Sequence, residues 1–316
     1  MFPINDTHQA EVSKAYIDFE GTDLIRKRIL TPLSDVPKSG KIPVFGNGLA
    51  KVITTPSAPM DPAAVLTHGV QLVDFGLETY RRKVPVSDEE MADYDLPLTP
   101  VKIAAEGLKY NRDLTQELVL STFMETTAGY AAGHAIDVSA LTQWNDPGGG
   151  QAALDEFSDA IALIGSGTDL LGVLSWDVYI ALRRAWADLL SETRTPDPLA
   201  LEAMARLAGL DRGFVLGAAE YDASEDPEAE SMTRVWTNGT AYVVRIAPNG
   251  NARNHSCFGF SLSRGEKVTT PRIAGEDPEG YNVIAHGQYA NAITDKGAIS
   301  TAALINQAVH FYNCLS

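Results

Sequence analysis

Hydrophobic residues recur at helical spacing over one long segment in the first half of the chain. The segment VKIAAEGLKYNRDLTQELVLSTFMETT, residues 101–127, follows Thr99 and Pro100, and proline suits the first helical position. About 27 residues at about 1.5 Å each predict a helix of roughly 40 Å, long enough to act as a structural spine. Its hydrophobic stripe contains Val101, Ala104, Ala105, Leu108, Leu114, Leu118 and Phe123. Just upstream, Ser87 and Glu90 match a capping box that opens a shorter helix.

Helical and strand-like patterns alternate through the rest of the chain. Leu154, Phe157, Ile161 and Ile164 form one helical stripe. A second helix is expected after a cap at Ser175, and a third over residues 198–210. Hydrophobic and β-branched runs predict strands at LLGVLS, GFVLGAAEY, TRVWTNGTAYVVRIA and YNVIAHGQYANAIT, with a short closing segment at AALINQAV. The pattern indicates an α+β protein.

The first 86 residues lack a hydrophobic core of their own. Residues 1–40 show little periodicity and are interrupted by Pro32 and Pro37, which predicts an extended arm. From Lys41, β-branched segments on either side of a proline-rich tip predict a long two-stranded ribbon. In the second strand of this ribbon, the residues that point to one face and those that point to the other both include polar side chains. An isolated two-stranded ribbon is only marginally stable in water. We therefore expect this ribbon to lie on a partner.

Composition excludes several classes of protein. The formal net charge of −16, with only isolated basic triplets at residues 26–28 and 81–83, argues against nucleic-acid binding. The apolar region 161–176 is too short and too polar to span a membrane. The amino-terminal residues include early acidic side chains and no apolar stretch of signal-peptide length, which argues against secretion. Cys257 and Cys314 lie far apart, so we expect free thiols in a reducing compartment. Residues 220–230 contain six acidic and no basic side chains, which predicts an exposed loop.

The candidate catalytic and cofactor-binding stretches do not have the residues at the spacing that such sites require. The stretch TQWNDPGGG precedes a helix, but it lacks the Lys-Ser/Thr pair of a phosphate-binding loop, and Asp155 and Glu156 would repel a phosphate. GSGTDLLG does not have the glycine spacing of a dinucleotide fingerprint. His255 and Cys257 share a strand face without an identifiable partner base or carboxylate, so a buried structural cysteine is favoured. We expect no enzymatic activity, no cofactor and no metal site.

The order of these motifs resembles the major capsid proteins of tailed bacteriophages, with the Hong Kong phage capsid fold that encapsulin shells share. The resemblance rests on the ribbon, the spine segment, QWNDPGGGQAALDEFSDAIALI and GVLSWDVYIALRRA, followed by FVLGAAEYD, RVWTNGTAYVVRIA and the strand-rich tail. It implies an N-terminal arm at residues 1–40, an extended β-hairpin loop at 41–86, a peripheral domain with the spine helix at 87–165, an axial domain at 166–285 and a C-terminal return to the peripheral domain at 286–316.

The resemblance implies a structural subunit that self-assembles into hexamers and pentamers and forms an icosahedral head around double-stranded DNA. Expected partners are further copies of the chain, a separate scaffolding protein (or a propeptide already removed), the portal and a decoration protein. The expected location is the virion, after assembly in the host bacterial cytoplasm.

Some residues are expected to act in assembly or packing. Candidates for contacts between subunits are Lys51, Arg81, Arg82, Lys83 and Glu117, with the three basic residues facing acidic side chains such as Glu117 on a neighbour's spine. Lys51 lies in the loop where some relatives form cross-links, but nothing in the sequence identifies its partner. Trp144 is expected to pack, Asp146 and Pro147 to end a strand, and Gly148 to let the chain turn between domains.

Three other interpretations remain open. An encapsulin-type compartment shell has the same fold with a different cargo. A cytosolic hydrolase would need a convergent cluster of perturbed side chains in one cleft. A nucleic-acid-binding module would need a broad basic face.

Overall fold

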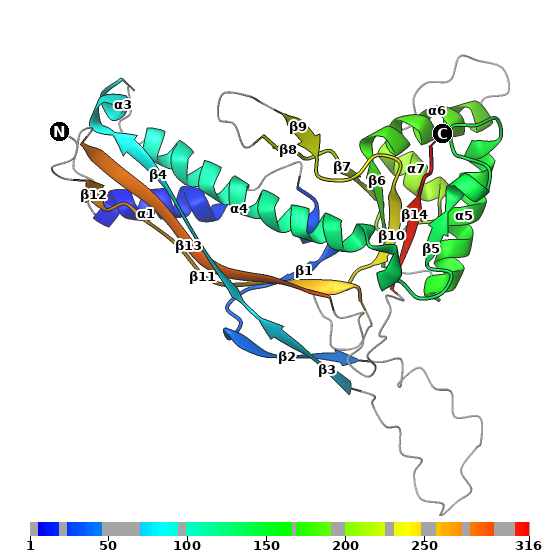
Figure 1. Ribbon diagram of the computed structural model, residues 1–316, viewed down its shortest axis with the longest axis horizontal. Helices are drawn as coiled ribbons and strands as arrows, with labels where there is room; N and C mark the ends of the chain where they lie inside the picture. Colours follow the sequence, from blue (N-terminus) through cyan, green and yellow to red (C-terminus); the bar gives the residue numbers. More distant parts are fainter. Residues whose placement is uncertain are drawn as a thin grey trace, which may run out of the picture.

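The computed structural model describes residues 6–18, 24–45, 70–93, 99–165, 169–190, 200–224, 231–247, 257–273, 279–293 and 307–315. Two five-stranded mixed sheets form the framework of the molecule. The 27-residue helix α4 (Thr99–Glu125) runs along one sheet toward the other (Figure 1). The long helix expected from the hydrophobic stripe is present, with Thr99 and Pro100 at its start.

The first sheet, called the long sheet, lies beside α4. Its strands are β1 (Thr31–Leu33), β4 (Glu78–Ser87), β11 (Gly259–Thr269), β12 (Arg272–Ile273) and β13 (Gly280–Ile293). β13 pairs antiparallel with β4 and β11, and β1 pairs parallel with β11. α4, α1 (Asp6–Asp18) and α3 (Asp88–Ala92) bury a hydrophobic cluster against one face of this sheet. Ser87 caps α3, because its Oγ accepts a hydrogen bond of 3.0 Å from the N–H of Glu90.

The second sheet, called the compact sheet, is covered on both faces. Its strand order is β5 (Ala135–Asp137), β14 (Ala308–Tyr312), β10 (Ala241–Arg245), β6 (Leu170–Ser175) and β7 (Phe214–Gly217). Leu170 and Leu174 of β6 pack in one cluster with α5 (Gly149–Ile164), α6 (Trp176–Leu190) and α7 (Leu201–Leu207). Leu171 and Val173 pack on the other face with the end of α4. Burial on both faces explains the continuous hydrophobic run LLGVLS.

Short elements complete the described part of the chain. They are α2 (Arg26–Ile29), the 3-10 helices η2 (Thr127–Gly129) and η3 (Val138–Ala140), and the hairpin β8 (Glu220–Asp222) with β9 (Met232–Arg234). The acidic stretch begins in β8, where Glu220 and Asp222 are exposed. Residues 225–230 lie outside the described residues.

The amino-terminal segment differs from the extended arm that its weak periodicity predicts. Residues 6–18 form α1, and residues 26–29 form α2. Val12 and Tyr16, four residues apart, are buried in the cluster beneath α4. Because only these two of the described side chains of α1 are hydrophobic and buried, the hydrophobic stripe of the helix is too narrow to produce a helical period in the sequence.

The two-stranded ribbon is present where the sequence predicts it, but its second strand continues further. β2 (Ser39–Phe45) pairs antiparallel with β3 (Val70–Gly76). After Leu77 the chain continues as β4 and joins the long sheet. The tip of the ribbon, with Lys51, lies outside the described residues.

The grouping of strands differs from the expected domain boundaries. β11 and the first part of β13 precede residue 286 and were expected in the axial domain, yet both strands belong to the long sheet beside α4. β5 and α5 lie within 87–165, the expected peripheral domain, yet they pack with the compact sheet, as does β14. The chain passes from one sheet to the other and back, so contiguous residue ranges do not separate the two layers.

Candidate functional site

The stretch around Trp144 ties the start of α5 to the carboxyl-terminal strand. The Trp144 side chain is fully buried, and its ring centroid lies 5.4 Å from those of Phe157 and Phe311. Its Nε1–H donates a hydrogen bond of 2.8 Å to Oε2 of Glu156, and its backbone N–H donates to the carbonyl of Cys314 at 2.9 Å. The stretch therefore fastens α5 to the strand next to β5.

The glycine run in this stretch serves close approach of backbone to backbone. Gly148 has a φ of 85°, in the left-handed region where glycine is unstrained. A Cβ on Gly149 would lie 2.2 Å from the carbonyl oxygen of Gln143. Gly148 was expected to let the chain turn between two domains. The turn instead lies within the part of the molecule built on the compact sheet, because β5, Trp144 and α5 all belong to that sheet and its core.

Two glycine-to-alanine changes should shift stability in opposite directions. Gly149→Ala should lower the free energy of unfolding by about 3 kcal/mol, because the new methyl group meets rigid backbone. Gly107→Ala, inside α4 with no atom within 4 Å of its Cβ position, should raise it by about 0.5–1 kcal/mol. Denaturant unfolding of both variants checks this. Equal effects would show that close approach does not explain the glycine run.

A groove of about 980 Å³ opens beside this stretch, between residues 145–151 and α6. Asp146, Pro147 and Gly148 are exposed and line it. Trp176 and Leu189 of α6, 37% and 45% exposed, also line it. The groove thus combines apolar and charged side chains on the outer side of the helices that cover the compact sheet.

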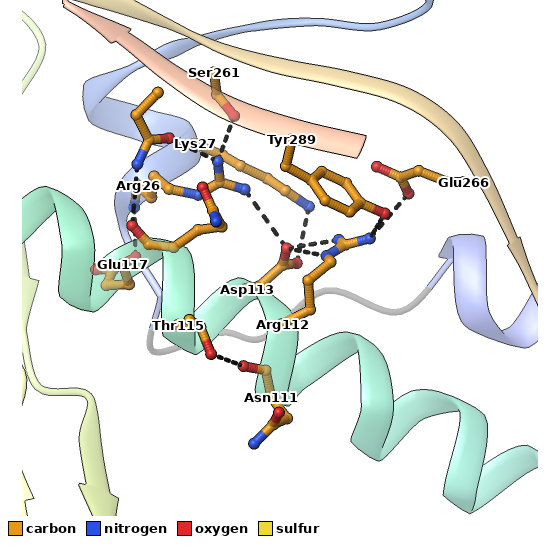
Figure 2. A network of polar contacts seen from close by, with 12 residues as sticks. Arg26, Lys27, Asn111, Arg112, Asp113, Thr115, Glu117, Ser261, Glu266 and Tyr289 are labelled. Carbon is orange, nitrogen blue, oxygen red and sulfur yellow. Dashed lines mark hydrogen bonds and ion pairs between the residues drawn. The ribbon is translucent and has the colours of Figure 1, made fainter. Parts of the chain in front are cut away.

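A buried polar network lies between α4, α2 and the long sheet (Figure 2). Asp113 is at its centre, with Arg112 at 2.6 Å, Arg26 at 3.5 Å and Lys27 at 3.6 Å. Burial alone would raise the pKa of Asp113, but these three charges outweigh burial and hold its pKa below the usual value. The network therefore holds charged side chains of α2 and α4 together beneath the sheet.

The same network reaches the sheet and α1 through Arg112. Its guanidinium donates to the hydroxyls of Tyr16 in α1 and Tyr289 in β13, and it lies 3.3 Å from Glu266 in β11. Arg26 donates to Ser261 at 2.6 Å and to Asn291 at 3.0 Å. Four segments distant in sequence are thus fixed to α4 by directional contacts.

Glu117 lies inside the subunit, where its carboxylate accepts hydrogen bonds from the same chain, and it is not available to a neighbouring subunit. Its side chain is fully buried, and its carboxylate accepts hydrogen bonds from the N–H groups of Ile25 and Arg26 and from Nε1–H of Trp236, at 2.8–3.1 Å. Burial raises the pKa of Glu117, while these donors oppose that rise. The prediction that Glu117 meets basic residues of a neighbour is therefore wrong.

The sequence contained a pattern that could have found this network. Lys109, Arg112, Asp113, Gln116 and Glu117 are all buried, and they continue the helical face of Ala105 and Leu108 toward Leu120. Charged residues on the hydrophobic side of a helix indicate buried, paired charges. The hydrophobic stripe was instead drawn through Leu114 and Leu118, which are only partly buried.

The basic triplet of β4 is divided between the two faces of the long sheet. Arg82 points toward α4, and its Nη2 donates to Oγ1 of Thr115 at 3.2 Å. Arg81 and Lys83 alternate with it and are exposed on the opposite face. Two of the three residues are thus available for contacts outside the subunit.

His310 should make the subunit sensitive to acid. The His310 ring is 2% exposed and stacks on Tyr242 at 4.6 Å, and neither ring nitrogen has a hydrogen-bond partner among the described residues. Burial lowers its pKa to about 4 from the ordinary 6.5. Between pH 4 and pH 6.5 the His310 ring is therefore neutral in the folded chain but protonated in the unfolded chain. The free energy of unfolding is accordingly highest above about pH 6.5 and falls as the pH drops toward 4. The loss at pH 4 should be about 3 kcal/mol.

The test of His310 compares unfolding at several pH values. His310→Phe keeps a ring against Tyr242 and removes the titrating group. Its free energy of unfolding should change less between pH 7 and pH 4 than that of the unaltered chain, by about 3 kcal/mol. Identical pH dependence of the two chains would refute the assignment.

The described residues contain no group of three or more His, Cys, Asp or Glu side chains placed to hold a metal ion. Within the same residues, no helix is long and apolar enough to cross a membrane. Cys257 and Cys314 are buried thiols that are not joined in a disulfide, and His255 lies outside the described residues.

Comparison with known proteins identifies the fold. No family model matches the sequence, and no curated protein matches it. A phage-related protein from Bordetella bronchiseptica RB50 is similar with a TM-score of 0.71 and 15% identity, over 96% of both chains. A virus-like particle from Pyrococcus furiosus has a TM-score of 0.54 and 12% identity, over 96% of this chain and 99% of that one. The capsid of the cyanophage P-SCSP1u has a TM-score of 0.54 and 12% identity, over 92% and 88% of the two chains.

These likenesses cover nearly the whole chain at low identity. The chain therefore has the fold of phage capsid and virus-like particle proteins. The α+β capsid fold expected from the order of motifs is confirmed.

Proposed function

We propose that this chain is the structural subunit of a tailed-bacteriophage head, which assembles into hexamers and pentamers and encloses double-stranded DNA. The observation that carries the proposal is the likeness to a phage-related protein over 96% of both chains, together with the likeness to a phage capsid. Both extend across the two sheets and the long helix, which a shared local motif alone would not produce.

The shape of the subunit supports assembly. β2 and β3 form a two-stranded ribbon in the lower part of the view (Figure 1), and Ile42 and Phe75 of this ribbon pack in one cluster with Phe260 and Leu262 of β11. The subunit's own long sheet therefore covers part of the ribbon, while the exposed side chains of Lys41 and Asp74 leave surface for contact with a neighbour. The groove beside α6 adds exposed Trp176 and Leu189, apolar surface suited to contact with another chain.

Other aspects of the proposal follow from the role of a head subunit. A scaffolding protein, a portal and a decoration protein are its proposed partners, and the virion, after assembly in the host cytoplasm, is its proposed location. The packaged DNA would be enclosed without sequence-specific binding, in keeping with the net charge of −16. The subunit would act without catalysis.

An encapsulin-type compartment shell is the second candidate. The likeness to the Pyrococcus furiosus particle, which covers 99% of that chain, favours it. The two candidates share the self-assembling subunit and differ in cargo, DNA in one and protein in the other.

Electron microscopy of the purified chain, with sedimentation of the same sample, tests the proposal. Round shells, or rings of five and six subunits, are the expected result. A homogeneous monomer or dimer that is unchanged by crowding or by a scaffold would overturn both candidates. Nucleic acid or protein recovered from shells formed in cells would then distinguish the head from the compartment.

A further inference from the structure

On one face of the long sheet, the charged side chains of the described strands are all basic. The antiparallel register places Lys267 opposite His286 and His286 opposite Arg81, so their side chains share one face. Arg264 and Lys83 lie on the same face by the same register, because a bulge between Arg264 and Lys267 restores the alternation. Tyr289 and Arg82, which contact α4, alternate with these residues and point to the opposite face.

We call this surface the cationic face and define it as Lys38, Arg81, Lys83, Arg264, Lys267 and His286. Lys38, just before β2, joins it at a hollow of about 380 Å³ lined also by Arg264, Lys267, His286 and Gln288. The five Lys and Arg side chains are exposed. The buried Nδ1 of His286 has no hydrogen-bond partner among the described residues.

The charges of this face are not neutralised within the described part of the subunit. None of its five Lys and Arg side chains forms an ion pair with a described residue. The strand positions on this face, 79, 81, 83 and 85 in β4 and 282, 284, 286 and 288 in β13, include no acidic residue. In contrast, Lys41 in β2 and Arg272 in β12 both have carboxylate partners.

We infer that the cationic face binds carboxylates of a second copy of this chain. Each copy carries a formal charge of −16, so two copies repel each other unless a contact brings opposite charges together. A concentrated basic face on an acidic chain is complementary to the average surface of its own neighbours. The inference rests on the proposed function, because it assigns a contact to the assembling subunit.

Nucleic acid is the other polyanion that such a face could meet. The observations favour a second copy, because five cations beside a small hollow make a local surface, whereas duplex binding needs a broad basic face.

The test is charge reversal at the hollow with a matched control. The variant carries Lys38→Glu, Arg264→Glu and Lys267→Glu. The control carries Lys14→Glu, Arg28→Glu and Arg206→Glu, three exposed residues on α1, α2 and α7 without a described ion pair, so both variants have the same net charge. Sedimentation and electron microscopy measure the fraction of chain in shells or capsomers, at low and at high ionic strength. Thermal unfolding confirms that both variants fold.

The expected result is a loss of about tenfold or more in assembled chain for the hollow variant, with the control close to the unaltered chain. Assembly of the unaltered chain should also weaken at high ionic strength, since salt screens exposed charge pairs. Normal assembly of the hollow variant, or an equal loss in the control, would overturn the inference alone. Normal assembly with loss of bound DNA would assign the face to nucleic acid. An unaltered chain that remains monomeric would overturn the proposed function as well.

Discussion

Replacing Trp144 by alanine should lower the free energy of unfolding by about 3–5 kcal/mol. The side chain is fully buried between Phe157 and Phe311, so its removal opens a cavity in the core of the compact sheet. The substitution also removes the indole N–H that donates a hydrogen bond to the half-buried carboxylate of Glu156. Denaturant unfolding of the unassembled subunit measures the change.

Trp176 provides the matched control for this substitution. It is 37% exposed on α6, and its ring contacts Tyr179. Trp176→Ala should therefore cost less than about 1 kcal/mol of stability. Similar losses in the two variants would mean that Trp144 is not a central packing residue. Because Trp176 lines the groove, the control chain also shows whether that groove contributes to assembly.

Glu117→Ala is the second change with a large expected effect. Removing the carboxylate leaves the N–H groups of Ile25 and Arg26 and the indole of Trp236 without their acceptor in a buried site. It also takes a negative charge from beside the buried guanidinium of Arg26. Breaking a buried charge network by removing one member costs about 3–5 kcal/mol, and the same loss is expected here.

The conservative variant separates hydrogen bonding from volume. Glu117→Gln keeps the size of the side chain but turns one of the two acceptor oxygens into a donor, so it should still lose about 1–3 kcal/mol. Glu106→Gln, on the half-exposed part of the same helix, should change stability by less than about 0.5 kcal/mol. Denaturant unfolding of all three variants checks this, and a neutral Glu117→Gln would contradict the role of the carboxylate.

Local patterns predicted the local structure well. The start at Thr99 and Pro100, the length of α4 and the cap at Ser87 depend on residues that are close in sequence. The continuous apolar run of β6 likewise indicated a strand buried on both faces. The order of such elements was sufficient to identify the capsid fold.

Contacts between distant segments could not be predicted in the same way. β4 pairs with β13 about two hundred positions later, and no residue of β4 indicates that partner. The domain boundaries failed for this reason. The role of Glu117 was missed because its three donors come from Ile25, Arg26 and Trp236, which lie far from it in sequence. Likewise, the sequence alone does not show that Arg82 faces α4 while Arg81 and Lys83 face away from it, because this depends on which face of the long sheet α4 covers.

The contact between α2 and α4 limits how the amino terminus can be processed. Two of the three donors to Glu117 are backbone N–H groups of Ile25 and Arg26. A protease that removed the chain through Arg26 would leave a buried carboxylate with a single donor, on the helix that links the two sheets. Any trimming between α1 and Ile25 would keep both donors, but it would remove Val12 and Tyr16 from the cluster beneath α4. A cut that leaves both contacts in place therefore has to lie upstream of α1.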